Sequence, residues 1–152
     1  MNNSLYNSPL EMAARLAAIL DARSHMTRNE RELAAIDFLT TNAGQFGLYP
    51  ANLHGDSIYV ATEFAARIQY INKGIRYAVA HGIITPIKTD AEIEFTLSDQ
   101  GQDFVGRLSS QYLTDYMRAL NPVLVYVDSR TDREVIRRIE EQGVEPIKED
   151  RT

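Results

Sequence analysis

The sequence predicts a mainly α-helical protein with one small β-hairpin. Segments with apolar residues at three- and four-residue spacing follow helix-capping residues along most of the chain. Residues 93–97 instead alternate apolar and polar side chains, as a half-buried strand does. With 152 residues, 44% of them hydrophobic, the chain suits one core with appendages rather than two domains or a disordered segment.

The first helix is predicted from Ser8 to about Arg23. Ser8 is a capping residue, Pro9 fits the first helical position, and Glu11 reaches back from the third. The helix carries an apolar stripe made of Met12, Leu16, Ile19 and Leu20. Because this stripe precedes the segment expected to form the main core, we interpret it as a surface for a partner helix. Packing against the rest of the chain is the alternative.

The next segments are predicted to be helical up to a glycine cap. Thr27 and Glu30 form a capping box, and the helix that they begin is expected to end near Asn42. A loop rich in turn residues follows. Residues 57–81 return to helical spacing, as two helices or one bent helix, and Gly82 is expected as a left-handed cap.

A hairpin and further helices complete the prediction. Residues 83–87 and 93–97 are expected to be strands joined by a turn at 89–92, after which Ser98 caps a helix. The helical spacing continues through Ser109 and Ser110 until Asn121-Pro122, which is expected to stop or kink it. Residues 123–127 fit a strand or a helix equally well. A capping box then starts a last helix, made by Thr131 and Glu134, before an acidic tail.

This order of elements is typical of a winged-helix module. Three helices are followed by a two-stranded hairpin and a further helix, so the helix near 68–81 takes the recognition position and the hairpin is the wing. We therefore divide the chain into an N-terminal partner-binding helix, a winged-helix domain, and a C-terminal helical extension with its tail. Their boundaries are 1–27, 28–120 and 121–152.

The charge pattern favours a protein partner over DNA. The net charge is −5, whereas residues 57–89 carry four basic side chains and one acidic one, a balance of +3. DNA-binding proteins are normally basic as a whole. The four local cations either contact phosphates or cover a solvated helix face; they are Arg67, Lys73, Arg76 and Lys88.

Several classes of chemistry are not expected. The chain has no cysteine, so disulfides and thiolate metal sites are excluded, and its three histidines are scattered. No nucleophile elbow or phosphate-binding loop is convincing, so we expect no catalytic residues, no metal and no cofactor. Without a leader or an apolar run long enough for a bilayer, a cytoplasmic location is expected.

Five stretches of the sequence resemble the middle component of ABC-three-component systems, including the small kleisin-like subunit of Lamassu-type defence complexes. They are residues 33–39, the pair Leu53-His54, residues 74–84, the hairpin, and residues 108–112. The resemblance implies a non-catalytic adaptor in bacterial immunity against phage or plasmids. It would bind an SMC-like coiled-coil ATPase and link it to an effector, often a nuclease, with DNA reached through the assembled complex.

Two other classes of function remain open at this point. A winged-helix transcription regulator would need a homodimer interface from the terminal helices and a basic recognition helix. The acidic balance of the whole chain makes this reading less attractive. An enzyme would need a catalytic constellation, and the sequence offers none.

Overall fold

A computed structural model describes residues 8–54 and 59–144, which form six helices and a small three-stranded sheet. The helices are α2 (Pro9–Ala22), α3 (Glu30–Thr41), α4 (Val60–Ala80), α5 (Asp99–Gly106), α6 (Gln111–Asp128) and α7 (Asp132–Val144). The strands are β1 (Arg28–Asn29), β2 (Ile84–Lys88) and β3 (Ile93–Leu97). The prediction of a mainly helical protein with a small hairpin is confirmed. The predicted acidic tail after residue 144 lies outside the described residues.

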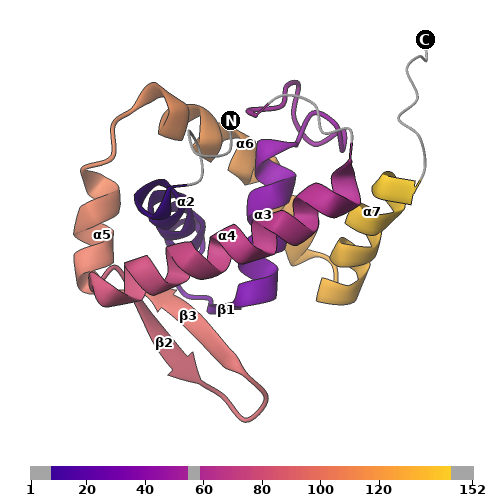
Figure 1. The fold of residues 1–152 in the computed structure, drawn as a ribbon. Helices are drawn as coiled ribbons and strands as arrows, with labels where there is room; N and C mark the ends of the chain where they lie inside the picture. Colours follow the sequence, from indigo (N-terminus) through magenta and orange to yellow (C-terminus); the bar gives the residue numbers. More distant parts are fainter. Residues whose placement is uncertain (1–7, 55–58, 145–152) are drawn as a thin grey trace.

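The sheet is antiparallel, and β3 is its central strand. The strand order is β1-β3-β2, with Phe95 opposite Arg28 on one side and Pro86 on the other. Figure 1 shows the β2–β3 hairpin projecting away from the helices. The turn at 89–92 is closed by the Thr89 hydroxyl, which accepts hydrogen bonds from the backbone N–H groups of Ala91 and Glu92. The predicted hairpin and its turn are therefore confirmed.

The short strand β1 accounts for a wrong prediction about the start of α3. Residues 28 and 29 pair with β3, so they are extended and the capping role moves to Asn29. Asn29 and Glu32 form the capping box, with bonds of 2.7 and 2.8 Å. Thr27, the predicted cap, instead donates its hydroxyl hydrogen to Glu94 on β3. The other predicted capping residues, Ser8, Ser98 and the pair Thr131–Glu134, do cap their helices.

In the second half of the chain the helices differ from prediction at residues 109–110, and they exclude one of the two alternatives at Pro122. The helical spacing does not continue through residues 109–110, because α5 ends at Gly106 and Ser110 caps α6. Pro122 does not stop the chain from being helical: α6 includes it, and residues 123–127 are helix. A proline inside a helix costs about 3 kcal/mol. Burial of Leu120, Val123 and Leu124 on the core side of α6 offsets this cost.

Residues 60–80 form one helix, and its end is set by a glycine. α4 is continuous from Val60 to Ala80. Gly82 then adopts a left-handed conformation, with φ of 73°, as predicted. Gly74 lies where α4 meets α2, and a Cβ atom built on it would stand 2.5 Å from Cβ of Met12. The absence of a side chain at Gly74 thus allows the two helices to pack closely.

Helix α2 is central to the fold rather than peripheral. It packs against α3, α4, α5 and α6, and every residue from Met12 to Leu20 is buried. Figure 1 shows it surrounded by these helices. One continuous apolar core contains side chains from α2 to α7, so the core does not divide at residue 27 or at residue 120.

Candidate partner-binding surface

A buried ionic cluster joins four helices. Asp37 of α3 accepts two hydrogen bonds from Arg15 of α2, at 2.8 and 2.9 Å, and one from Arg67 of α4, at 3.0 Å. The hydroxyl of Tyr116 on α6 donates another, at 2.6 Å. The same Nη1 of Arg67 also donates to the hydroxyl of Thr41, at 2.9 Å. Asp37, Arg15 and Tyr116 have no solvent exposure.

Electrostatics keep this cluster ionised. Burial by itself raises the pKa of Asp37, but the charges of Arg15 and Arg67, with the hydrogen bonds from Arg15 and Tyr116, hold it well below its usual range. Burial also opposes the charge on Arg15, and Asp37 more than restores it, so the pKa of Arg15 is raised. The cluster is closed to solvent and its groups are engaged with one another. It therefore stabilises the fold and offers no site for substrate.

His54 and Tyr112 form a polar pair next to the cluster. Nε2 of His54 lies 2.6 Å from the Tyr112 hydroxyl, and the rings stack with centroids 5.7 Å apart. Burial and the charges of Arg15 and Arg67 lower the pKa of His54 to about 3. Burial is also the main cause that raises the pKa of Tyr112 to about 12. Both side chains are therefore neutral at physiological pH, and the pair anchors the loop before α4 onto α6.

The residues predicted to bind a partner lie inside the core. Met12, Leu16 and Ile19 have no exposed surface, and Leu20 is 1% exposed. Of the two interpretations that the sequence left open, packing against the rest of the chain therefore describes this stripe, and α2 lies against α3, α4, α5 and α6. Apolar spacing identifies the face of a helix that is buried, but it does not tell whether the same chain or a partner buries it.

The four predicted phosphate contacts separate into two groups. Arg67 is 6% exposed and is engaged with Asp37, so it does not face nucleic acid. Lys73 and Arg76 are exposed on α4, and Lys88 is exposed on β2. Only the last three remain on the surface.

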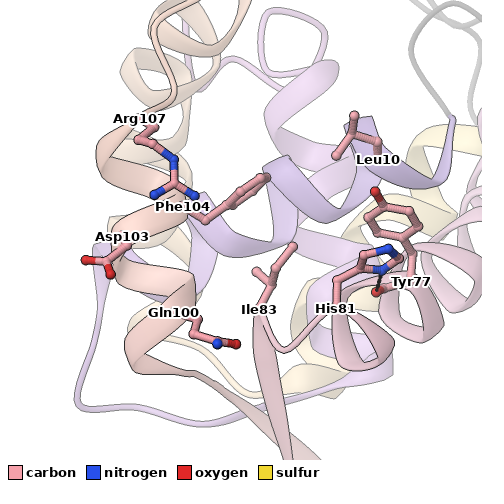
Figure 2. A pocket seen from close by; sticks show the side chains of 8 residues that line it. All are labelled: Leu10, Tyr77, His81, Ile83, Gln100, Asp103, Phe104 and Arg107. Carbon is pink, nitrogen blue, oxygen red and sulfur yellow. Dashed lines mark hydrogen bonds between the residues drawn. The ribbon is translucent and has the colours of Figure 1, made fainter.

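A cleft of about 390 Å³ lies where the N-terminal end of α2, the C-terminal end of α4 and α5 meet. Its apolar lining comes from Leu10, Ile83 and Phe104, and the rings of Tyr77 and His81 form one wall, stacked 3.9 Å apart. Figure 2 shows Phe104 and Ile83 between the aromatic wall and the side chains of α5. This cleft is our candidate partner-binding surface.

Three polar side chains complete the lining: Gln100 and Asp103 of α5, and Arg107, which follows the last residue of α5. In Figure 2 the Asp103 carboxylate points away from the cleft, whereas the Arg107 guanidinium extends alongside Phe104. The imidazole of His81 is oriented by its Nδ1, which lies 2.9 Å from the Tyr77 carbonyl. The sequence alone did not assign Gln100, Asp103 or Arg107 to a partner. Leu10 is one signal that was available, since it is an apolar residue at the start of α2 outside the predicted stripe.

The described residues contain neither a metal-binding cluster nor a membrane-spanning helix. No group of three His, Asp or Glu side chains is placed to hold a metal ion. No helix in these ranges combines the length and the apolar character needed to cross a membrane.

Comparison with known proteins gives one result. A family model described as ABC-three component (ABC-3C) system Middle Component 2 matches residues 5–149, which is nearly the whole chain. The comparisons with curated proteins and with solved structures give no match.

Proposed function

Because the chain belongs to the family of middle component 2 of ABC-three-component systems, we propose that it is a non-catalytic, kleisin-like adaptor. In this role it binds an SMC-like coiled-coil ATPase and links it to an effector such as a nuclease, in the cytoplasm. The assembled complex acts in Lamassu-type bacterial defence against phage or plasmids. The family match over residues 5–149 carries the proposal, since a middle component of such a system works with protein partners.

We propose that the fold is a winged helix. The order α2, β1, α3, α4, β2, β3 and the strand order β1-β3-β2 support this assignment. In it, α4 holds the recognition position and the β2–β3 hairpin is the wing. Helices α6 and α7 are additions that pack on the module.

The buried cluster supports a role without catalysis. Asp37 is fully buried and accepts hydrogen bonds from Arg15, Arg67 and Tyr116 within the core. A general acid or base must reach the proton that it transfers, within about 3 Å. Asp37 is enclosed and ionised, so it does not meet this condition.

Co-expression with the two other components of the system tests the proposal. Tagged chain is expected to recover both the ATPase and the effector, and untagged effector is expected to reach tagged ATPase only when the chain is present. Recovery of neither component would refute the adaptor role. So would an ATPase and effector that associate equally well without the chain.

DNA binding as a homodimeric transcription regulator is the second candidate, and one observation favours it. Lys73, Arg76 and Lys88 remain exposed on α4 and on the hairpin. The net charge of −5 opposes a tight complex with phosphate. Sub-micromolar binding of the isolated chain to duplex DNA at physiological salt, abolished by Arg76→Glu, would establish this function instead. Weak binding that Arg76→Glu leaves unchanged would exclude it.

A further inference from the structure

The cleft between α2, α4 and α5 presents apolar surface that residues 8–54 and 59–144 leave exposed. Leu10 is 50% exposed at its edge, although it is a large apolar side chain on a helix that is otherwise buried from Met12 to Leu20. Phe104 lines the same cleft and is partly exposed. A single exposed leucine is ordinary on a protein surface. An exposed leucine at the edge of a concave cleft that is also lined by aromatic rings is typical of a binding site.

The cleft is held open by a rigid frame. The Ser98 hydroxyl lies within hydrogen-bond distance of the carbonyl oxygens of Gly82 and Ile83, at 2.5 and 2.9 Å, and accepts the N–H of Gly101, at 2.9 Å. A Cβ atom on Gly101 would stand 2.1 Å from the Ile83 carbonyl oxygen. The backbone of α5 therefore lies so close to the residue before β2 that no side chain fits at position 101. These contacts fix α5 against the end of α4. A ligand would find the cleft preformed, which reduces the entropy lost on binding.

The charges around the cleft favour an occupant that carries a negative charge. Arg107 brings a permanent positive charge beside Phe104, while Asp103, the carboxylate among the described lining residues, points outward (Figure 2). With Nδ1–H of His81 donating to the Tyr77 carbonyl, its Nε2 is left to accept a hydrogen bond from an N–H or O–H group of the occupant. An acidic group next to an apolar anchor complements the charge of Arg107.

We propose that the cleft docks a peptide segment of another component of the system. The segment inserts a leucine- or phenylalanine-sized side chain between Leu10 and Phe104, and it places an Asp or Glu against Arg107. A volume of about 390 Å³ accommodates a few side chains of such a segment, and the cleft is open on one side, as a peptide requires. This inference rests on the proposed adaptor function and names the surface by which the adaptor holds one of its partners.

Two cleft variants and one matched control test this inference. Leu10→Asp places a charge at the apolar anchor, and Arg107→Glu reverses the charge that selects the acidic residue. Val125→Asp makes a comparable change at a side chain on α6 that is 67% exposed and does not line the cleft. All three sites are exposed, so thermal melts of the three variants are expected to match wild type.

The measurement is the affinity of each variant for the purified ATPase component and, separately, for the purified effector component. Both cleft variants are expected to weaken the same one of these two interactions at least tenfold, while Val125→Asp retains both. Unchanged binding of both partners by the cleft variants, with wild-type chain binding normally, overturns the cleft and leaves the adaptor function intact. Wild-type chain that binds neither partner instead refutes the adaptor function. A change only in self-association overturns the proposal in favour of a second copy of the chain.

Discussion

Asp37 is a single carboxylate that receives donors from three other helices. Arg15 binds it through two bonds, and Arg67 and Tyr116 add one each. Loss of one member of a buried ion pair costs about 3–5 kcal/mol, because the remaining charge is left without compensation in the core. Loss of the Asp37 charge would leave two buried arginines, Arg15 and Arg67, without their counterion.

Asp37→Asn is therefore expected to lower the free energy of unfolding by about 3–5 kcal/mol. The amide keeps the size of the side chain but removes the negative charge that offsets Arg15 and Arg67. Urea denaturation followed by circular dichroism measures the change. Asp21→Asn, at an exposed carboxylate of α2, is the control and is expected to stay within about 0.5 kcal/mol of wild type. A loss of less than 1 kcal/mol at Asp37 would show that the arginines are solvated in the folded chain.

Glu32 gives the fold a dependence on pH of a particular sign. Burial raises the pKa of Glu32 from 4.5 to about 7; the Asn29 N–H opposes this shift and Asp132 of α7 adds to it. Between these values the folded state binds more protons than the unfolded state, so its stability decreases as the pH rises. The contribution of Glu32 is present below pH 4.5 and is lost as the pH rises through about 7.

Glu32→Gln is expected to remove this decrease while preserving the helix cap. A glutamine oxygen can accept the N–H of Asn29 as the glutamate does, so the capping box remains. The measurement is the free energy of unfolding of both proteins at pH 4.5, 5.5, 6.5 and 7.5. The free energy of unfolding of the variant is expected to exceed that of wild type by an amount that increases with pH across this range. A constant difference would contradict the raised pKa.

His54 affects the pH dependence of the free energy of unfolding in the opposite direction to Glu32. Its pKa of about 3 in the folded chain lies below the ordinary value of 6.5, so acidification favours the unfolded state. The wild-type curve therefore contains two opposing contributions. Only the difference between wild type and Glu32→Gln isolates the carboxyl group.

The contact between α2 and α4 depends on a residue without a side chain. A Cβ atom at Gly74 would lie 2.5 Å from Cβ of Met12, and both residues are buried on rigid helices. Gly74→Ala is expected to destabilise the fold by about 1–3 kcal/mol through overpacking, although alanine favours an isolated helix by about 1 kcal/mol. Thermal and chemical unfolding measure the effect.

Gly106→Ala is the matched control for this substitution. Nothing lies within 4 Å of a Cβ atom at Gly106, which is the last residue of α5. Here the higher helix propensity of alanine is not opposed, so the variant is expected to be as stable as wild type or up to about 1 kcal/mol more stable. If both alanines were equally tolerated, the close approach of α2 and α4 would be refuted.

The elements that the sequence predicted well are those determined by neighbouring residues. Ser8, Ser98 and Thr131 cap helices through bonds to residues three positions away, and the spacing of such residues is visible in the sequence. The elements that it predicted wrongly depend on distant contacts. Asn29 caps α3 because β1 pairs with β3, which makes residues 28 and 29 extended.

The candidate site, like the wrongly predicted elements, depends on contacts between residues far apart in the sequence. Charge and apolar spacing identified Arg67 and Leu16 as notable, but both are buried by elements far away in the chain. The cleft itself was not predicted. Leu10, Tyr77 and Phe104 come from three helices, and they line one surface only when these helices pack together. Of the three predicted cations that remain on the surface, Lys73 and Arg76 belong to α4 and Lys88 to β2.

Leu16→Asp tests whether the N-terminal helix belongs to the core. Removing a buried leucine costs about 2–5 kcal/mol, and a buried charge without a partner costs several more. Together these approach the total stability of a typical domain, about 5–15 kcal/mol. The isolated variant is therefore expected to lose its cooperative melt, whereas Leu10→Asp, on the same helix, melts like wild type. A folded Leu16→Asp chain would restore the interpretation of α2 as a separate partner-binding helix.

The central position of α2 has a consequence for how the chain folds during synthesis. Arg23 and Arg28 pair with Asp128 at the end of α6, so the N-terminal part of the fold is completed by residues made about 100 positions later. At about 5–20 residues per second, this interval lasts roughly 5–20 s. During it, the stripe from Met12 to Leu20 leaves the ribosome before α4 and α6 exist to cover it. The nascent chain thus exposes the apolar side of α2 before the helices that bury it are made, and aggregation competes with folding during that interval.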